Sequence, residues 1–185
     1  MPNASVKVIG LTGSFGSGKS SALALFKKRG ADVFDADAVV HKLLKTAAVK
    51  KKISRAFGTL DRKKLAGVIF KSRSQRKKLE GILHPLVRKA MRKAVAGSQK
   101  KLIVCDIPLL FESGWKNRFD KTIYVDAPFE KRVSRLRKRG FQRSDVVTRS
   151  KAQWAAGRKK KQADIVIRNG GSLTDLKKQI NDLTF

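Results

Sequence analysis

A glycine-rich stretch near the start of the chain has the residue types and spacing that bind a polyphosphate. Residues 13–20 fit the pattern G-x-x-x-x-G-K-[ST] of a P-loop. The stretch consists of Gly13, Ser14, Phe15, Gly16, Ser17, Gly18, Lys19 and Ser20. Backbone N–H groups of such a loop surround the phosphates, and its glycines let the backbone approach them closely. We expect Lys19 to reach the β- and γ-phosphates and the Ser20 hydroxyl to ligate Mg²⁺.

The residues on either side of this loop support a P-loop over a chance glycine-rich turn before a lysine. Residues 6–11 are short, apolar and rich in β-branched types, which predicts a buried strand. Residues 21–28 predict a helix, whose N-terminus would add partial positive charge at the phosphates. Strand, loop and helix together predict an ATP-binding site.

Acidic residues follow two further predicted strands. Asp35 and Asp37 come after a strand at 31–34, and Asp106 ends a strand at 101–106. Ligands of parallel sheets gather at the carboxyl ends of strands, so we expect these acids near the P-loop. One acid of the Asp35–Asp37 pair should cap the next helix, and the other should orient an attacking hydroxyl. Asp106 either holds Mg²⁺, directly or through water, or caps the following turn.

Residues 38–97 predict a helical insertion between the second and third strands. Asp61 is the expected N-cap of a helix at 62–70. The longest predicted helix runs over 74–95, and Pro85 within it should produce a kink. We expect His84, beside that bend, to face a cleft.

An arginine-dense segment at 131–161 predicts a mobile lid. Gly140 should divide it into two helices, the second capped by Ser144. Such a hairpin could close over ATP, exclude water and neutralise charge on the transferred phosphoryl group. The alternative is a solvated basic helix, and for most of these arginines, taken individually, that alternative holds. We expect residues 159–161 (Lys-Lys-Lys) to face solvent.

Two more strands, at 121–126 and 163–167, and a last helix opened by a capping box at Ser172 complete the pattern. The fold class is therefore α/β, a P-loop NTPase fold with a five-stranded parallel sheet flanked by helices. The expected domains are a kinase core at 1–37 and 98–185, containing the lid, and the helical insertion at 38–97.

The chain is strongly basic, with 44 Lys and Arg against 14 Asp and Glu among 185 residues and a net charge of +30. This charge is compatible with binding of nucleic acid, with binding of a polyanionic small molecule, or with a solvated basic surface that binds neither. The basic residues are spread along the chain and aromatics are only 7%, so we expect non-specific nucleic-acid binding at most. The single cysteine excludes an internal disulfide, and the sequence predicts neither a signal peptide nor a membrane span. We expect a cytoplasmic protein, a monomer or small homo-oligomer.

From about residue 8 to 183 the chain resembles the dephospho-coenzyme A kinase family. The motifs that carry the resemblance are Gly-Leu-Thr-Gly (10–13), Asp-Ala-Asp (35–37), His-Pro-Leu-Val-Arg (84–88), Asp-Ile-Pro-Leu-Leu-Phe-Glu (106–112), Arg149 with Gln153, and Ala163-Asp164 with Asn169-Gly170. The P-loop alone indicates only the superfamily, whereas the other motifs, in this order and spacing, indicate the family.

The resemblance implies that ATP phosphorylates the ribose 3′-hydroxyl of dephospho-coenzyme A, giving coenzyme A and ADP. It implies that Asp37 is the base that orients the hydroxyl, that Arg149 is the lid arginine near the phosphates, and that Asn169 and Gly170 lie at the adenine. The helical insertion would grip the acceptor. The acceptor-binding residues that we expect are Asp35, Asp37, His41, His84, Pro108 and Leu109.

The chain also departs from the family pattern. Ser14 and Phe15 stand where the family usually has Gly-Ile, the insertion is short around residues 46–60, and the charge exceeds the family's norm. Two other functions remain open on the residues alone. One is a P-loop kinase that acts on a nucleoside or nucleotide, and the other is a basic P-loop ATPase that binds nucleic acid.

Overall fold

A computed structural model describes residues 6–185, with only the backbone at positions 62, 63, 70, 71 and 73. The chain divides into two compact units. The first, which we call the P-loop unit, contains the described residues up to 35 together with 97–185, and the second, the helical unit, contains 36–96. This division places Asp35 in the P-loop unit and Asp37 in the helical unit.

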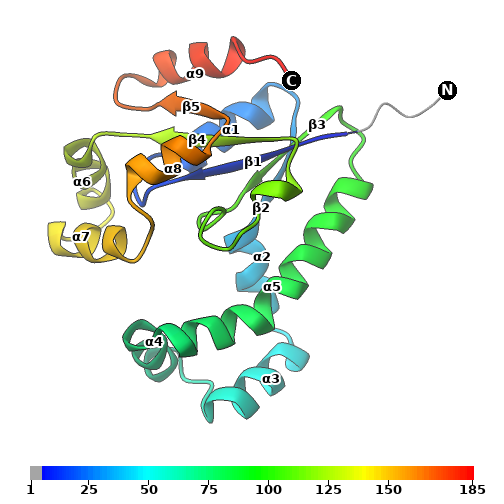
Figure 1. Ribbon diagram of the computed structural model, residues 1–185, viewed down its shortest axis with the longest axis vertical. Coiled ribbons are helices and arrows are strands. Elements are labelled where there is room, and N and C mark those ends of the chain that lie inside the picture. The colour runs from blue at the N-terminus through cyan, green and yellow to red at the C-terminus, as the bar shows by residue number, and fades with distance from the viewer. Residues whose placement is uncertain (1–5) are drawn as a thin grey trace. The chain divides into compact units, whose positions relative to one another are not determined.

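A five-stranded sheet forms the centre of the P-loop unit (Figure 1). Its strands are β1 (Lys7–Gly13), β2 (Asp32–Asp35), β3 (Leu102–Asp106), β4 (Lys121–Asp126) and β5 (Ile165–Arg168). The order is β2-β3-β1-β4-β5 and every neighbouring pair is parallel. The predicted fold class, a parallel sheet flanked by helices, is confirmed.

The strand order places a topological switch point between β1 and β3, because the chain leaves β1 toward β2 on one side and leaves β3 toward β4 on the other. Ligands of open α/β sheets bind in the crevice at such a point, beyond the carboxyl ends of the strands. The P-loop follows β1 directly. The strand order therefore positions residues 13–20 at the carboxyl ends of the strands, where a ligand is expected.

Helices α1 (Lys19–Lys28) and α9 (Leu173–Asn181) pack on one face of the sheet. The apolar side chains that form this core alternate along the strands and recur at helical spacing along α1 and α9. The buried residues of this core are Ile9, Leu11, Ala22, Phe26, Ala31, Val104, Ile123, Val125, Ile167, Leu176 and Ile180. The capping box predicted for α9 is confirmed, since Ser172 and Asp175 exchange hydrogen bonds.

The segment after β3, residues 107–119, packs on the opposite face. A Cβ atom on Gly10 of β1 would lie 2.6 Å from Leu110 and 2.7 Å from Phe119, so this face requires a glycine there. The segment includes a short 3₁₀ helix, η1 (Lys116–Arg118). Helix α8 (Ala156–Gln162) lies beside β4.

The arginine-dense segment differs from its prediction in two respects. It forms three helices and not two: α6 (Phe129–Arg137), α7 (Arg143–Lys151) and α8. Gly140 does separate the first two, with a φ of 84° that favours glycine. The cap predicted at Ser144 is wrong, because α7 begins earlier and its N-cap is Gln142, whose backbone N–H donates to the Asp145 carboxylate at 2.8 Å.

The helical unit consists of α2 (Ala36–Leu43), α3 (Ala47–Phe57), α4 (Arg62–Lys71) and α5 (Arg73–Ala96). Val49, Ile53 and Leu83 form its buried centre. The Asp61 side chain accepts a hydrogen bond from the Lys64 N–H at 2.8 Å, which confirms the predicted cap of α4. Helix α5 continues through Pro85 and changes direction along its length (Figure 1). Within residues 6–185 no helix is long and apolar enough to cross a membrane.

Candidate active site

The loop between β1 and α1 owes its shape to two glycines with positive φ. Gly16 has a φ of 80° and Gly18, the N-cap of α1, has a φ of 88°. The Ser17 N–H donates to the Ser14 carbonyl at 3.0 Å and closes the turn between them. This is the backbone course of a loop that wraps an anion at a helix N-terminus.

Side chains from outside the loop bind its carbonyl oxygens. The Ser17 carbonyl accepts hydrogen bonds from Asn169 at 2.8 Å and from Arg135 of α6 at 3.4 Å. The Phe15 carbonyl accepts one from Arg132 of α6 at 3.2 Å. Carbonyl oxygens repel phosphate, so holding them on these donors keeps them away from the anion site, which is left to loop N–H groups other than those of Phe15 and Ser17.

Asn169 packs against the loop closely enough to require glycine there. Its side chain is buried, and a Cβ atom on Gly18 would lie 2.1 Å from the Asn169 Nδ2 atom. Arg135 also donates to the Asn169 carbonyl at 2.8 Å and to its Oδ1 atom at 3.2 Å. Gly170, the next residue, faces Pro128, which would lie 3.1 Å from a Cβ atom. The structure thus brings Asn169, predicted from the resemblance, to the P-loop, and places Gly170, predicted with it, against Pro128.

Two polar contacts support the loop and the strand before it. The Ser14 and Tyr124 hydroxyls lie 2.7 Å apart, and burial raises the pKa of Tyr124 even though the Ser14 contact opposes the shift. The Thr12 hydroxyl donates to the Pro108 carbonyl at 3.1 Å. Pro108 therefore supports the strand that leads into the loop, and Leu109 beside it is half-buried.

Lys19 and Ser20 open α1 immediately after the loop. Lys19 is half-buried and Ser20 is exposed. Both residues lie in the first turn of α1. That turn presents free N–H groups and partial positive charge on the loop side.

Asp35 and Asp106 are paired across neighbouring strands. They end β2 and β3 and are register partners, and Asp106 is also the register partner of Leu11 in β1. The two carboxylates therefore lie at the carboxyl ends of neighbouring strands, and β3, which carries Asp106, is the neighbour of the P-loop strand β1. No group of three or more His, Cys, Asp or Glu side chains in the described part of the chain could hold a metal by itself.

Arg149 of α7 lies over an aromatic pair that includes a P-loop residue. Its guanidinium carbon is 4.8 Å from the centre of the Phe15 ring and 5.1 Å from that of Phe141. The two rings meet edge to face, with centres 5.3 Å apart. A guanidinium over an aromatic face is attracted by the ring quadrupole. The structure thus brings the predicted lid arginine to the P-loop.

The remaining predicted residues belong to the helical unit. Asp37 lies in the first turn of α2, and His41, in the last turn of that helix, is exposed. His84 lies in α5 and is partly buried. Burial lowers the pKa of His84, with Glu80 opposing this shift and Arg88 adding to it.

Several residues of the site were not predicted from the sequence, and one prediction is wrong. Lys159, expected to face solvent, is fully buried and forms an ion pair with Glu112, their atoms 2.6 Å apart. Arg132 and Arg135 look like their neighbours in a basic run, so nothing in the sequence distinguished them. Gln153 was a motif residue without a role, and its side chain accepts a hydrogen bond from the Phe15 N–H at 3.2 Å.

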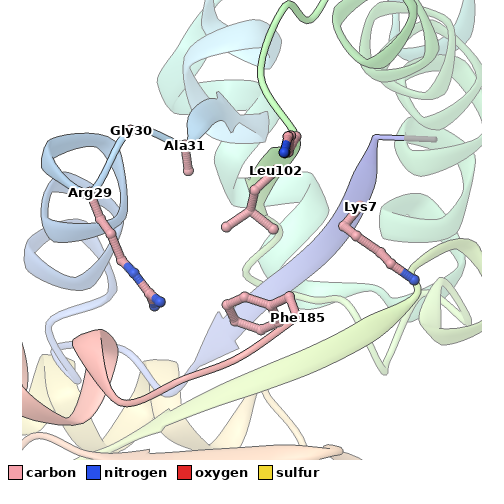
Figure 2. Close-up of a pocket in the computed structure, with 7 residues that line it drawn as sticks. Lys7, Arg29, Gly30, Ala31, Leu102 and Phe185 are labelled. Carbon is pink, nitrogen blue, oxygen red and sulfur yellow. The ribbon is translucent and has the colours of Figure 1, made fainter. Parts of the chain in front are cut away.

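A cavity of about 430 Å³ lies away from this chemistry (Figure 2). Lys7 and Leu102, at the amino ends of β1 and β3, line it together with Arg29, Ala31 and Phe185. The Arg29 guanidinium donates hydrogen bonds to the Ile180 carbonyl of α9 at 2.5 Å and to the Leu183 carbonyl at 2.6 Å. The cavity lies at the amino ends of the strands, whereas the P-loop lies at their carboxyl ends, so the cavity takes no part in the candidate active site.

The family model described as dephospho-CoA kinase matches residues 7–175. The chain belongs to the dephospho-CoA kinase family. Among curated relatives, the dephospho-CoA kinase of Thermus thermophilus is 37% identical over 180 residues, covering 94% of this chain and 88% of the relative. That of Bacillus licheniformis is 38% identical over 189 residues, covering 95% of this chain and 94% of the relative.

Solved structures agree with this assignment. A crystal structure of a Thermus thermophilus protein is 38% identical, with a TM-score of 0.84 over 97% of this chain and 99% of the other. The dephospho-CoA kinase of Campylobacter jejuni is 26% identical, with a TM-score of 0.65 over 94% and 93% of the two chains. A shikimate kinase from Bacteroides thetaiotaomicron, 16% identical with a TM-score of 0.56 over 95% and 94%, shares the fold.

Proposed function

We propose that this protein transfers the γ-phosphate of ATP to the ribose 3′-hydroxyl of dephospho-coenzyme A, giving coenzyme A and ADP. One observation supports this most directly. A P-loop follows β1, Asp106 ends the neighbouring strand β3, and Asp35 ends β2 on the far side of β3, in a chain of the dephospho-CoA kinase family. Phosphoryl transfer needs mainly positioning and charge stabilisation, and these residues supply both.

In this proposal the P-loop binds the β- and γ-phosphates through its N–H groups and Lys19. Ser17 supports the assignment, because its hydroxyl is buried and has no hydrogen-bond partner within residues 6–185. A phosphate oxygen would supply that partner. Arg149, held over the Phe15 ring, stabilises charge on the transferred group, and Asn169 and Gly170 border the adenine.

Ser20 and Asp106 fit a Mg²⁺ ion that arrives with the nucleotide. A hydroxyl and a carboxylate are oxygen donors of the kind Mg²⁺ prefers, and an ion bound largely by phosphates and water needs few protein ligands. Bound there, Mg²⁺ would neutralise phosphate charge. Asp35, the register partner of Asp106, adds a second negative charge at the same edge.

Asp37 is the proposed base, which accepts or orients the proton of the attacking 3′-hydroxyl. The acceptor-binding role falls to Asp35, His41, His84, Pro108 and Leu109, as the resemblance implies. Both substrates are polyanions, so the +30 charge would speed their capture. A cytoplasmic location would supply ATP and keep the buried Cys105 thiol reduced.

The test is ADP release with ATP and Mg²⁺ in the presence of different acceptors. Dephospho-coenzyme A should stimulate release, whereas adenosine, AMP, CMP and single-stranded RNA should not. Release with a nucleoside or nucleotide alone would keep the ATP site but overturn the proposed acceptor. The +30 charge favours an RNA-stimulated ATPase as a second candidate, and release with RNA alone would establish it.

A further inference from the structure

Lys159 is a fully buried cation that the proposed mechanism does not use. It lies in α8, and its Nζ atom is 2.6 Å from the Glu112 Oε1 atom, in a carboxylate that is itself only 13% exposed. Burying two charges carries a large desolvation cost, which their attraction offsets only in good geometry. Burial lowers the pKa of Lys159, the Glu112 carboxylate opposes that shift, and Lys19 adds to it.

Glu112 joins this lysine to the chain segment between α7 and α8. The same Oε1 atom accepts a hydrogen bond from the Trp154 N–H at 2.9 Å. Its other oxygen, Oε2, is buried and has no hydrogen-bond partner in the described part of the chain. The carboxylate thus depends on Lys159 and on one backbone N–H group, and it fixes the backbone at Trp154.

The residue before Trp154 contacts the P-loop. The Gln153 side chain accepts a hydrogen bond from the Phe15 N–H at 3.2 Å. Arg149, one helical turn before Gln153, lies over the ring of the same Phe15. A continuous series of contacts therefore runs from Lys159 through Glu112 and the Gln153–Trp154 backbone to Phe15.

We propose that Glu112 and Lys159 are positioning residues for the nucleotide site. Their ion pair fixes the backbone at Trp154, so that Gln153 stays on the Phe15 N–H and Arg149 stays over the Phe15 ring. This inference rests on the proposed function, since it deepens the role of the ATP site. It predicts that loss of the pair lowers kcat/KM for ATP and leaves KM for dephospho-coenzyme A nearly unchanged.

The same helix provides a matched control. Lys160 forms an ion pair with Asp126, 2.5 Å apart, but its side chain is 41% exposed. Lys159→Met and Lys160→Met remove the same charge from neighbouring positions. Only the first touches the series of contacts that leads to Phe15.

The experiment measures kcat, KM for each substrate, the Kd for ADP and Tm for Lys159→Met, Glu112→Gln, the double variant and Lys160→Met. Lys159→Met should lower kcat/KM for ATP by about tenfold to a hundredfold, the size of effect that slight misplacement of reacting groups produces. KM for dephospho-coenzyme A should stay within about twofold of wild type, and Lys160→Met should resemble wild type. The double variant should lose less than the sum of the single losses, because it leaves no unpaired buried charge.

Gln153→Met tests the same idea without disturbing the buried pair. It removes the acceptor of the Phe15 N–H, and it should weaken ADP binding and raise KM for ATP while Tm stays near the wild-type value. This variant decides the matter if Lys159→Met does not fold.

Two results would overturn the proposal. One is that Gln153→Met keeps wild-type constants for ATP and ADP. The other is that Lys159→Met loses activity toward both substrates equally and only in proportion to its unfolded fraction. Failure of the proposed function would look different, because wild-type protein would then not phosphorylate dephospho-coenzyme A at all. The ADP affinities of the variants would still test the positioning role.

Discussion

Replacing Gly18 by alanine tests whether the P-loop is held by the contacts described above. Gly18 has a φ of 88°, and an added Cβ atom would lie 2.1 Å from the Asn169 Nδ2 atom. The left-handed conformation costs an alanine about 1–2 kcal/mol, and the less flexible unfolded chain returns about 0.4–1 kcal/mol. Asn169 must also move, which breaks its hydrogen bond to the Ser17 carbonyl and leaves buried polar groups unpaired, at about 1–3 kcal/mol.

Gly30→Ala is the control for backbone strain alone. Gly30 has a φ of 95°, and a Cβ atom there would have no neighbour within 4 Å. The two variants share the strain term, so the difference between them reports the collision with Asn169. We expect Gly18→Ala to be less stable than Gly30→Ala by about 1–3 kcal/mol, or roughly 2–12 °C in Tm for a chain of this size.

The assay is thermal and urea unfolding of both variants, with ADP titration of the folded proteins. Gly18→Ala should also bind ADP more weakly, because the Ser17 carbonyl loses a donor that turns it away from the phosphates. Equal stabilities of the two variants would refute the reasoning, since Asn169 would then not press on the loop. Unchanged ADP affinity would refute the link between Asn169 and loop shape.

Four further predictions concern single residues. Lys19→Ala should lower turnover by about two to three orders of magnitude, and wild-type-like turnover would remove it from the site. Asp37→Asn should lower kcat more than it raises KM for ATP, and a larger kcat loss in Asp35→Asn would reverse their roles. Arg149→Ala should slow phosphoryl transfer in a single turnover while the protein stays folded, and an unchanged rate would contradict its role. Burial raises the pKa of Cys105 to about 12, so a thiol reagent should label it only after unfolding; full labelling of native protein at pH 8 would contradict this.

The P-loop and the sheet could be predicted because their signals are local. The G-x-x-x-x-G-K-[ST] pattern specifies a backbone course within eight residues, and apolar runs specify the strands beside it. The caps at Asp61 and Ser172 were predictable for the same reason, because each is satisfied by an N–H group three residues away. These features need no knowledge of distant contacts.

Lys159 shows where local reasoning fails. It stands first in a run of three lysines, and no local property separates it from Lys160 and Lys161. Its burial depends on which side of α8 faces the sheet and on Glu112, far away in the sequence, which offsets its charge. A partner so distant in the sequence leaves no trace in a pattern of neighbouring residues.

The arginines of α6 likewise could not be assigned to the site from local sequence. Arg132 and Arg135 hold P-loop carbonyls, whereas Arg137 in the same helix is exposed. The sequence indicated that some arginines serve the phosphates, and only the arrangement of α6 against the loop distinguishes them. The chemical roles of Asp37 and Arg149 stay predictions from the family resemblance.

The most direct test of the central claim is the position of the transferred phosphate. Wild-type protein is incubated with Mg²⁺, ATP labelled in its γ-phosphate and dephospho-coenzyme A, with Lys19→Ala as the control, and the product is examined by phosphorus NMR and mass spectrometry. The account predicts one labelled phosphate on the ribose 3′-oxygen, formed in equal amount to ADP and nearly absent with the variant. Label on any other position, or ADP formed without a labelled coenzyme A, would contradict it.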